Sequence, residues 1–177
     1  MEKWDLYTKD RQHTGKTMIR GEKIPEGYYR MVVHVCIFNS KGEMLIQQRQ
    51  VNKSGWSNLW DMSVGGHSLA GENSSQAAMR EVSEEIGLSL PLEQQRPALT
   101  IDFDTGFDDI YTVILDVDTD SLTLQQEEVQ AVKWASLEEI CGMIDEGTFI
   151  PYHKSLIELL FFLSTHCDAH TRPDKSK

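Results

Sequence analysis

The segment GGHSLAGENSSQAAMREVSEEIGL, residues 65–88, decides the fold because it joins a glycine pair to a helix with well-marked ends. Residues 73–86 have the pattern of a helix, and Gly87 stands where helices commonly end in a left-handed residue. Gly65 and Gly66 predict a tight turn with exposed carbonyls ahead of this helix. We therefore expect a loop followed by a helix over residues 65–88.

The predicted helix carries three carboxylates within five positions, those of Glu81, Glu84 and Glu85. At about 100° per residue, they share one face of the helix, within an arc of about 100°. An adjacent apolar stripe is formed by Met79, Val82 and Ile86. This stripe is suited to packing on a sheet, so the acidic face is expected at the edge of the core.

The acidic face has two interpretations. Most runs of charge are solvated surfaces, and the like-charge pair Glu81 and Glu85 costs an isolated helix only about 0.2–0.5 kcal/mol. Carboxylates beside the carbonyls of a glycine turn, however, are hard oxygen ligands that suit Mg²⁺ or Mn²⁺ better than zinc. Such ions bridge phosphates and lower the pKa of a bound water. The preceding glycine pair therefore favours a metal-binding face.

The spacing of the residues in this segment resembles the Nudix box at every defining position. The matching residues are Gly66, Glu72, Arg80, Glu81, Glu84, Glu85 and Gly87. The resemblance implies an α/β fold, a Nudix-type α/β/α sandwich with a mixed β-sheet. It also implies a hydrolase that uses Mg²⁺ or Mn²⁺ to split the pyrophosphate bond of a nucleoside diphosphate linked to another moiety.

The same resemblance implies roles for individual residues. The metal ligands would be the carbonyl of Gly65 and the carboxylates of Glu81, Glu84 and Glu85. The loop and helix would be braced by Gly66, Glu72, Arg80 and Gly87. The base that activates water varies among Nudix branches, and the candidates here are Glu81, Glu127 and Glu128.

The flanking sequence resembles the Nudix branch that includes isopentenyl diphosphate isomerase. The similar stretches are WDLY at 4–7, VVHVCIFN at 32–39, LIQQR at 45–49, LWDMSVGGHSLAGE at 59–72 and EEVQAVKWASLEEI at 127–140. This resemblance raises the alternative of proton shuttling at an allylic carbon without hydrolysis. In the isomerase pattern, however, a catalytic Cys stands at the position of Gly65 and a metal-binding His at the position of Arg30. Because this chain lacks both side chains, hydrolysis is favoured. A non-catalytic nucleotide-binding module is the third hypothesis, and it should have lost a box glutamate.

Other side chains are candidates for substrate contacts. Arg20, Arg30 and Arg49 could meet substrate phosphates, because Arg binds phosphate through two parallel hydrogen bonds. His67 matches an isomerase metal ligand, but it could equally be a substrate contact or a hydrogen-bonding residue of the loop. Aromatic residues that could stack a nucleobase, or belong to the core, are Trp56, Trp60, Phe103, Phe107 and Tyr111. His34 is interpreted as a core histidine with a satisfied hydrogen bond.

The rest of the chain predicts strands followed by helices within a single domain, residues 1–177. Residues 31–38 are nearly continuous in β-forming residues and predict a strand covered on both faces. A hairpin turn then leads into a returning strand at 44–50. Further strands are expected at 98–104, 109–117 and 129–135, and helices at 136–147 and 152–166. Residues 1–28 predict an N-terminal hairpin or arm, and residues 168–177 a frayed tail.

The composition limits the kinds of molecule that the protein is expected to bind. A net charge of −11 over 177 residues argues against binding of polymeric nucleic acid, which requires clustered Lys and Arg. Neither a signal-peptide core nor a membrane span is found, so we expect a cytoplasmic protein that acts on a small-molecule diphosphate, as a monomer or homodimer. The three cysteines, Cys36, Cys141 and Cys167, are expected to be buried thiols, because their spacing indicates neither disulfides nor a zinc site.

Overall fold

The computed structural model describes residues 1–167 and 169–170, so most of the predicted tail lies outside the described residues. The strands are β1 (Lys3–Tyr7), β2 (His13–Ile19), β3 (Arg30–Phe38), β4 (Met44–Arg49), β5 (Trp60–Asp61), β6 (Val64–His67), β7 (Leu99–Phe103), β8 (Gly106–Ile114) and β9 (Val129–Ala135). The helices are α1 (Ser74–Ile86), a short 3-10 helix η1 (Thr119–Ser121), α2 (Leu137–Asp145) and α3 (Lys154–Leu163).

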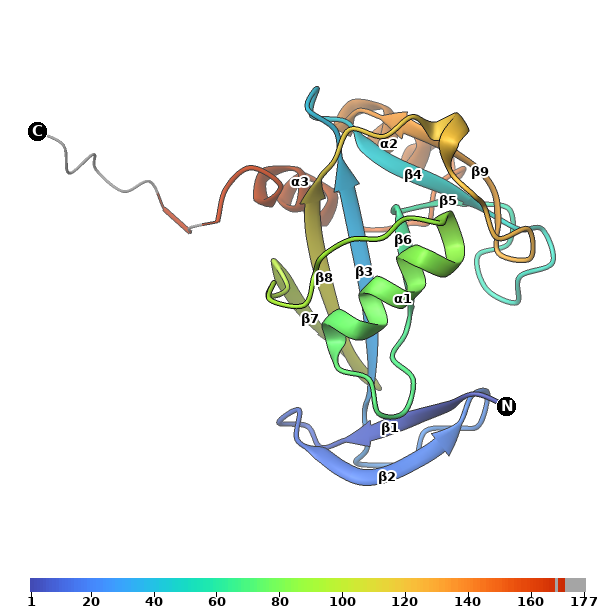
Figure 1. The fold of residues 1–177 in the computed structure, drawn as a ribbon, viewed down its shortest axis with the longest axis vertical. Coiled ribbons are helices and arrows are strands. Elements are labelled where there is room, and N and C mark those ends of the chain that lie inside the picture. Colours follow the sequence, from blue (N-terminus) through green and yellow to red (C-terminus); the bar gives the residue numbers. More distant parts are fainter. Residues whose placement is uncertain (168, 171–177) are drawn as a thin grey trace, which may run out of the picture.

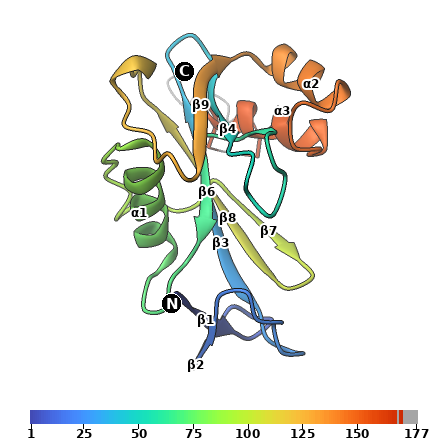
Figure 2. The ribbon, with the colours of Figure 1, turned by 90° about the vertical axis from the view of Figure 1, so that its right-hand side faces the viewer.

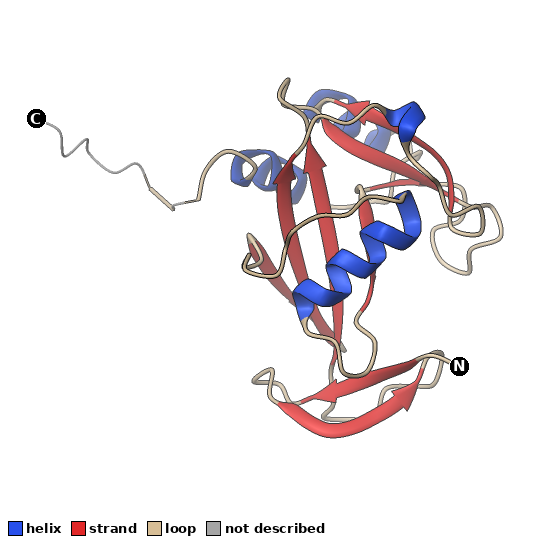
Figure 3. Ribbon diagram, viewed as in Figure 1, coloured by secondary structure: helices blue, strands red, loops and turns tan. Residues whose placement is uncertain are grey.

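The main sheet is mixed, as predicted (Figure 3). Its central path runs β5-β4-β3-β8-β7, with β6 paired to β3 and β9 paired to β4. Strands β3 and β8 are parallel along their whole length, whereas the other pairs are antiparallel. The long parallel pair places the middle of β3 at the centre of the fold.

Helices cover both faces of this sheet, which confirms the predicted α/β/α sandwich (Figures 1 and 2). On one face, Val33, Val35 and Ile37 of β3 pack with the apolar stripe of α1. On the other face, Cys36 and Phe38 pack with α2 and α3. Because side chains alternate along a strand, a continuous run of β-forming residues can serve two cores at once.

The predicted hairpin after β3 forms only at its turn. The Asn39 side chain accepts hydrogen bonds from the backbone of Lys41 and Glu43, and Phe38 pairs with Met44. Beyond that pair, β4 leaves β3 and pairs with β9 instead. The reason is that β6 occupies the edge of β3 at residues 32–35. Strand β8 also begins three residues earlier than expected and ends three residues earlier.

Helix α1 has the predicted ends. Asn73 caps its start through a reciprocal pair of hydrogen bonds with Gln76, and Gly87 ends it in the left-handed conformation at a φ of 72°. Local sequence therefore fixes where this helix begins and ends.

Strands β1 and β2 form a separate antiparallel hairpin at one end of the main sheet (Figure 1). Tyr7 and Tyr29 exchange two backbone hydrogen bonds, which tie the hairpin to the segment leading into β3. The backbone N–H of Ala70 donates to the carbonyl of Lys3 at 2.8 Å, and that of Gly71 donates to the Asp5 carboxylate at 2.7 Å. The hairpin is thus held against the connection between β6 and α1.

The expectation of three buried cysteines is wrong for two of them. Cys36 is buried within β3, but Cys141 is half-buried on α2 and Cys167 is exposed beyond the end of α3. In the described part of the chain, no helix combines the length and the apolar character needed to cross a bilayer.

Candidate active site

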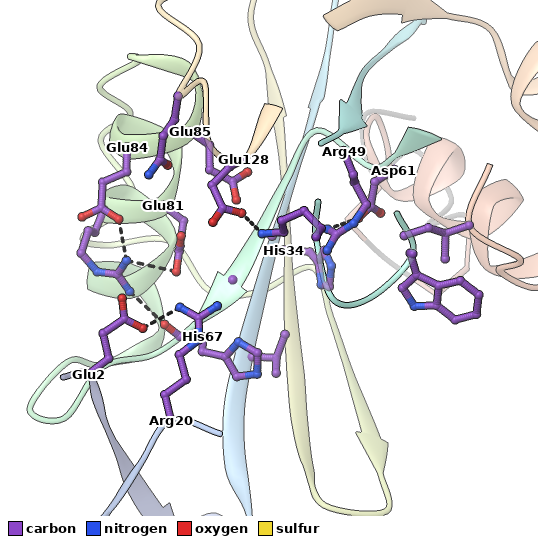
Figure 4. A pocket seen from close by; sticks show the side chains of 18 of the residues that line it. Glu2, Arg20, His34, Arg49, Asp61, His67, Glu81, Glu84, Glu85 and Glu128 are labelled. Atoms are coloured by element: carbon purple, nitrogen blue, oxygen red, sulfur yellow. Dashed lines mark hydrogen bonds and ion pairs between the residues drawn. The ribbon is translucent and has the colours of Figure 1, made fainter. Parts of the chain in front are cut away.

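A cavity of about 310 Å³ lies between α1, the edge of β6 and the N-terminal hairpin. The loop after β4, the loop before β9 and the segment after α2 complete its walls. The predicted residues Gly65, Gly66, His67, Arg49, Arg80, Glu81, Glu84, Glu85 and Glu128 all line it. Figure 4 shows the helix glutamates on one side of the cavity and Arg49 with Asp61 on the other.

The glycine pair does not form the predicted turn. Gly65 and Gly66 lie within strand β6, opposite His34 and Val33 of β3. Because consecutive residues of a strand face opposite sides, a side chain on Gly65 would meet the His34 imidazole, whereas one on Gly66 would overlap the Glu81 carboxylate. Both positions therefore require glycine because a neighbouring side chain approaches the backbone closely, and not because the backbone adopts an unusual angle.

The carbonyl of Gly65 lies on the edge of β6 that does not pair with β3. The N–H of Ser68 donates to the Met31 carbonyl at 3.1 Å, and hydrogen-bonded and non-bonded pairs alternate along an antiparallel ladder. By this alternation the backbone N–H and C=O of Gly65 face away from β3. The carbonyl of His67, two residues later, faces the same way and accepts a hydrogen bond from Arg80 at 2.9 Å.

The three carboxylates of α1 share one face but have different surroundings. Glu85 is only 5% exposed and accepts a hydrogen bond from the Gln47 amide at 2.9 Å. Glu81 lies beside Gly66 and pairs with Arg80 at 3.0 Å. Glu84, whose side chain is 51% exposed, pairs with the same Arg80 at 2.9 Å.

Burial changes the acidity of two of these groups. It raises the pKa of Glu85 to about 7, against an opposing effect of the Gln47 hydrogen bond, and the nearby charge of Glu81 adds to the rise. Burial also raises the pKa of Glu81, although the Arg80 guanidinium opposes this. Removal of these carboxylates from water thus favours their protonated forms.

Arg80 connects the loop and the helix of this segment. Its guanidinium pairs with both oxygens of Glu72, at 2.8 and 3.0 Å. The same group holds Glu81 and Glu84 and donates to the His67 carbonyl. One cation therefore links the start of the β6–α1 connection to the acidic face of the helix.

The carboxylates surround the cavity without converging on one point. Among the described residues, no three His, Cys, Asp or Glu side chains are grouped to hold a single metal ion. The reason is that Glu81 and Glu84 turn toward Arg80, while Glu85 turns toward Gln47. The donor set still fits Mg²⁺ or Mn²⁺, because every candidate ligand is an oxygen. In addition, the buried Oε1 of Gln47 beside Glu85 has no hydrogen-bond partner within the described part of the chain.

The loop before β9 contributes one of the two predicted glutamates. Glu128 lines the cavity and forms an ion pair with Lys53, whereas Glu127 is exposed and does not line it. The backbone N–H of Gln125 donates to the Glu85 carbonyl at 2.9 Å, which docks this loop on the end of α1. Glu127 is therefore no longer a candidate base.

Several lining residues had no signal in the sequence. The buried carboxylate of Asp61 accepts hydrogen bonds from Arg49 at 3.1 Å and from the Tyr152 hydroxyl at 2.9 Å. Lys53 reaches the cavity from the loop after β4. Tyr152 lies 91 positions from Asp61, so only the tertiary fold brings these two groups together.

His34 is a hydrogen-bonded core histidine, as expected, yet it also lines the cavity. Its Nδ1 lies 2.8 Å from the Asp108 carboxylate. Burial lowers the pKa of His34, but the charge and hydrogen bond of Asp108 outweigh this and raise it to about 9. The hydrogen bond of His34 was predicted from the sequence, but its position beside the cavity was not.

His67 stacks on Trp4 of the hairpin, with ring centroids 4.2 Å apart and planes 5° from parallel. Burial lowers the pKa of His67 to about 4, and the charges of Arg30 and Arg20 act in the same direction. The imidazole is therefore neutral at physiological pH. Arg30 lies over the rings of Trp4 and Phe103 and does not line the cavity, so it is not placed to meet a phosphate there.

The aromatic residues considered for base stacking differ in whether they line the cavity or belong to the core. Trp56 is 54% exposed and lines the cavity from the loop after β4. Trp60 packs against the core on the α2 and α3 side, and Phe107 and Tyr111 are buried. Phe103 lies under Arg30, outside the cavity. Of these five candidates, only Trp56 lines the cavity.

Known proteins resemble this chain in sequence and fold. A family model described as the NUDIX domain matches residues 28–160. An uncharacterized Nudix hydrolase of Listeria monocytogenes is 49% identical over 152 residues, which cover 86% of this chain and 90% of that protein. An isopentenyl-diphosphate Delta-isomerase of Escherichia coli is 28% identical over 114 residues, covering 62% of this chain and 63% of the isomerase. The crystal structure of a Deinococcus radiodurans protein has a TM-score of 0.71 at 24% identity, covers 90% of this chain and 97% of its own, and is alike in fold.

Proposed function

The chain belongs to the Nudix hydrolase family, whose members generally act on nucleoside diphosphate derivatives, and we propose that it cleaves the pyrophosphate bond of a nucleoside diphosphate linked to another moiety. Nudix hydrolases generally use divalent metal ions, and Mg²⁺ or Mn²⁺ is the proposed cofactor here. One observation carries the proposal: all three box glutamates of α1 line the same cavity as two cations from outside the box, Arg49 and Lys53.

The proposed metal ligands are the carboxylates of Glu81, Glu84 and Glu85 and the carbonyl of Gly65. A bound divalent ion would neutralise phosphate charge and lower the pKa of a coordinated water. The all-oxygen donor set and the direction of the Gly65 carbonyl support this assignment. Arg80 keeps Glu81 and Glu84 within reach of the cavity, and the hydrogen bond from Gln47 holds Glu85 at its inner wall.

Glu128 is the proposed general base, with Glu81 as the remaining alternative. A general base needs a carboxylate that is ionised, held in place and open to the substrate. Glu128 lies on the wall of the cavity, and its ion pair with Lys53 holds the carboxylate in place. Glu81 is more buried, its pKa is raised, and it already holds Arg80.

Arg49 and His67 are the proposed substrate contacts. The guanidinium of Arg49 is held by Asp61 and by the carbonyl of Gly55, so it presents a fixed positive group for a phosphate. His67 is neutral and offers ring nitrogens that can donate or accept a hydrogen bond.

The isomerase alternative has weaker support. Gly65 stands where the isomerase pattern has its cysteine, and the structure adds a steric reason against such a side chain. A Cβ at Gly65 would lie 2.5 Å from Cδ2 of His34. The position thus lacks the thiol and also lacks room for one while His34 keeps its place.

A substrate panel tests the proposal. Purified protein with Mg²⁺ or Mn²⁺ is given sugar nucleotides, dinucleotides, deoxynucleoside triphosphates and coenzyme A, and the phosphate and nucleotide products are identified. We expect cleavage of at least one diphosphate, lowered at least 100-fold by Glu85→Gln and by Glu84→Gln. Absence of cleavage across the panel, or full activity of both variants, would contradict the proposal.

Two further arms separate the alternatives. Glu128→Gln is compared with Glu127→Gln, which removes an adjacent exposed carboxylate that does not line the cavity. We expect a large loss of turnover for the first and none for the second. Isopentenyl diphosphate is supplied in D₂O, where isomerisation would appear as deuterium exchange into the allylic product. The cytoplasmic location and the choice between monomer and homodimer stay predictions.

A further inference from the structure

The N-terminal hairpin supplies one wall of the cavity, although it precedes residues 28–160, which match the family model. Glu2 lies just before β1 and Arg20 just after β2, and both side chains line the cavity. Figure 4 shows Arg20 extending toward the cavity beside His67, on the side away from Arg49. The hairpin therefore brings two charged side chains to the cavity, and both residues lie outside the part of the chain that matches the family model.

Several contacts that do not involve these two side chains fix the hairpin in place. Lys3 and Asp5 accept hydrogen bonds from Ala70 and Gly71, and Trp4 stacks on His67. The backbone N–H of Arg20 also donates to the Glu2 carbonyl at 3.0 Å. The position of Arg20 relative to the cavity is thus set by backbone and aromatic contacts.

The ion pair between Arg20 and Glu2 is not needed for this anchoring. The two groups lie 2.6 Å apart, with side chains 52% and 48% exposed. Ion pairs between side chains as exposed as these contribute little to stability. Arg49 and Lys53 have less exposed partners, in Asp61 and Glu128, and Arg80 is held by three glutamates at once. Arg20 is therefore the cation that can most easily exchange its carboxylate for another anion.

We propose that Arg20 binds a phosphate group of the substrate, on the side of the cavity opposite Arg49, and that Glu2 competes with this phosphate for the Arg20 guanidinium. The inference rests on the proposed function, because it assigns one end of the diphosphate to the hairpin. A planar guanidinium donates two parallel hydrogen bonds to a phosphate as readily as to a carboxylate. The substrate phosphates then span from the hairpin wall to the loop after β4.

Binding of methylenediphosphonate in the presence of Mg²⁺ tests the inference, because this diphosphate analogue cannot be hydrolysed. Isothermal titration calorimetry is applied to the wild type and to Arg20→Gln, Arg20→Lys and Glu2→Gln. We expect Arg20→Gln to weaken binding about 10-fold, Arg20→Lys to weaken it less, and Glu2→Gln to strengthen it about threefold. Lys9→Gln, which removes an exposed cation from the turn of the same hairpin, should leave the affinity unchanged.

The opposite signs separate a binding role from a structural one. If the ion pair only stabilised the hairpin, removal of either partner would weaken binding alike. The double variant Glu2→Gln with Arg20→Gln should bind as weakly as Arg20→Gln alone, because Glu2 acts only through Arg20. Equal losses for both single variants, an unchanged affinity of Arg20→Gln, or no binding to the wild type would each overturn the inference.

Failure of the inference is distinguishable from failure of the proposed function. If Glu85→Gln abolishes hydrolysis while Arg20→Gln binds and turns over like the wild type, the hydrolase stands and the hairpin has no part in phosphate binding. If no diphosphate in the panel is cleaved, yet binding of the analogue depends on Arg20 and Glu2 as stated, the proposed reaction fails and the anion site stands.

Discussion

The imidazole of His34 fills the space that a side chain at Gly65 would need. A Cβ added at Gly65 would lie 2.5 Å from Cδ2 and 2.6 Å from Nε2 of His34. Asp108 fixes the ring from its other side through the 2.8 Å contact with Nδ1. Gly65 of β6 therefore cannot gain a side chain unless His34 of β3 moves.

Replacement of Gly65 by Ala or Cys should displace His34. Overpacking of this kind costs about 1–3 kcal/mol of unfolding free energy, measurable by urea denaturation. We expect hydrolysis to fall at least 10-fold in both variants, and Gly65→Cys to gain no isomerase activity. The double variant Gly65→Ala with His34→Ser should regain part of the stability, since the smaller side chain frees the space. A stable and fully active Gly65→Ala protein would show that the cavity wall does not need this pair.

Glu85→Gln should change the pH dependence of stability in metal-free protein. The folded protein holds the pKa of Glu85 at about 7, above its ordinary value of 4.5, so the folded state binds a proton more tightly than the unfolded state does. Stability from this group is complete below about pH 4.5 and is lost as the pH rises through about 7. At pH 8 the loss of unfolding free energy approaches about 3 kcal/mol, because each unit of difference between the folded and unfolded pKa is worth about 1.4 kcal/mol.

The measurement compares thermal unfolding of the wild type and Glu85→Gln with a chelator, from pH 4.5 to 8. We expect the variant to be the more stable protein at pH 8 and the difference to shrink toward pH 4.5. Glu84→Gln is the control, because its side chain is half exposed and should show a much smaller change. A constant difference across this range would mean that Glu85 does not titrate as stated.

Features of the site that depend on residues close together in the sequence could be predicted, whereas features that depend on distant residues could not. Helix α1, its cap residues and its acidic face depend on neighbours within a few positions, so residues 73–88 could be predicted directly. The buried strand β3 could also be predicted, because a continuous run of β-forming residues is a local signal. Contacts such as that of Tyr152 with Asp61, 91 positions apart, leave no local pattern.

The glycine pair shows how a local signal can mislead. Glycine is common in tight turns, and the sequence therefore predicted a turn at Gly65 and Gly66. In the structure the constraint is the close approach of His34 on one side and Glu81 on the other. A local interpretation identifies the residue type that the position needs but not the neighbours that impose it.

Arg80→Gln should destabilise the fold and make it more dependent on a divalent metal. The substitution removes the cation shared by Glu72, Glu81 and Glu84 and leaves their partly buried charges unpaired. Loss of one partner from such a network costs about 3 kcal/mol. Added Mg²⁺ should raise the melting temperature of the variant by more than that of the wild type, because an ion bound to the carboxylates replaces part of the lost charge.

The control for this comparison is Arg96→Gln, which removes an exposed arginine that does not line the cavity. Its melting temperature and its response to Mg²⁺ should match those of the wild type. Equal responses of Arg80→Gln and the wild type to Mg²⁺ would indicate that the metal does not bind to Glu81 and Glu84.

Trp56→Ala should weaken the binding of nucleotides without loss of stability. The indole is 54% exposed and lines the cavity from a loop anchored by Arg49, whose guanidinium donates to the Gly55 carbonyl. Stacking of a base on an aromatic side chain is worth about 1–3 kcal/mol, so KM for a nucleotide substrate should rise at least fivefold. Trp56→Phe should keep most of the affinity, because a phenyl ring also stacks.

Two comparisons distinguish base stacking from a general disturbance of this loop. Val51→Ala shortens another exposed apolar side chain of the loop that does not line the cavity, and its KM should match the wild type. Methylenediphosphonate has no base, so its affinity should be the same for Trp56→Ala and the wild type. A parallel loss of nucleotide and methylenediphosphonate binding would mean that Trp56 acts by positioning Arg49 and Lys53, since only a contact with the base discriminates between the two ligands.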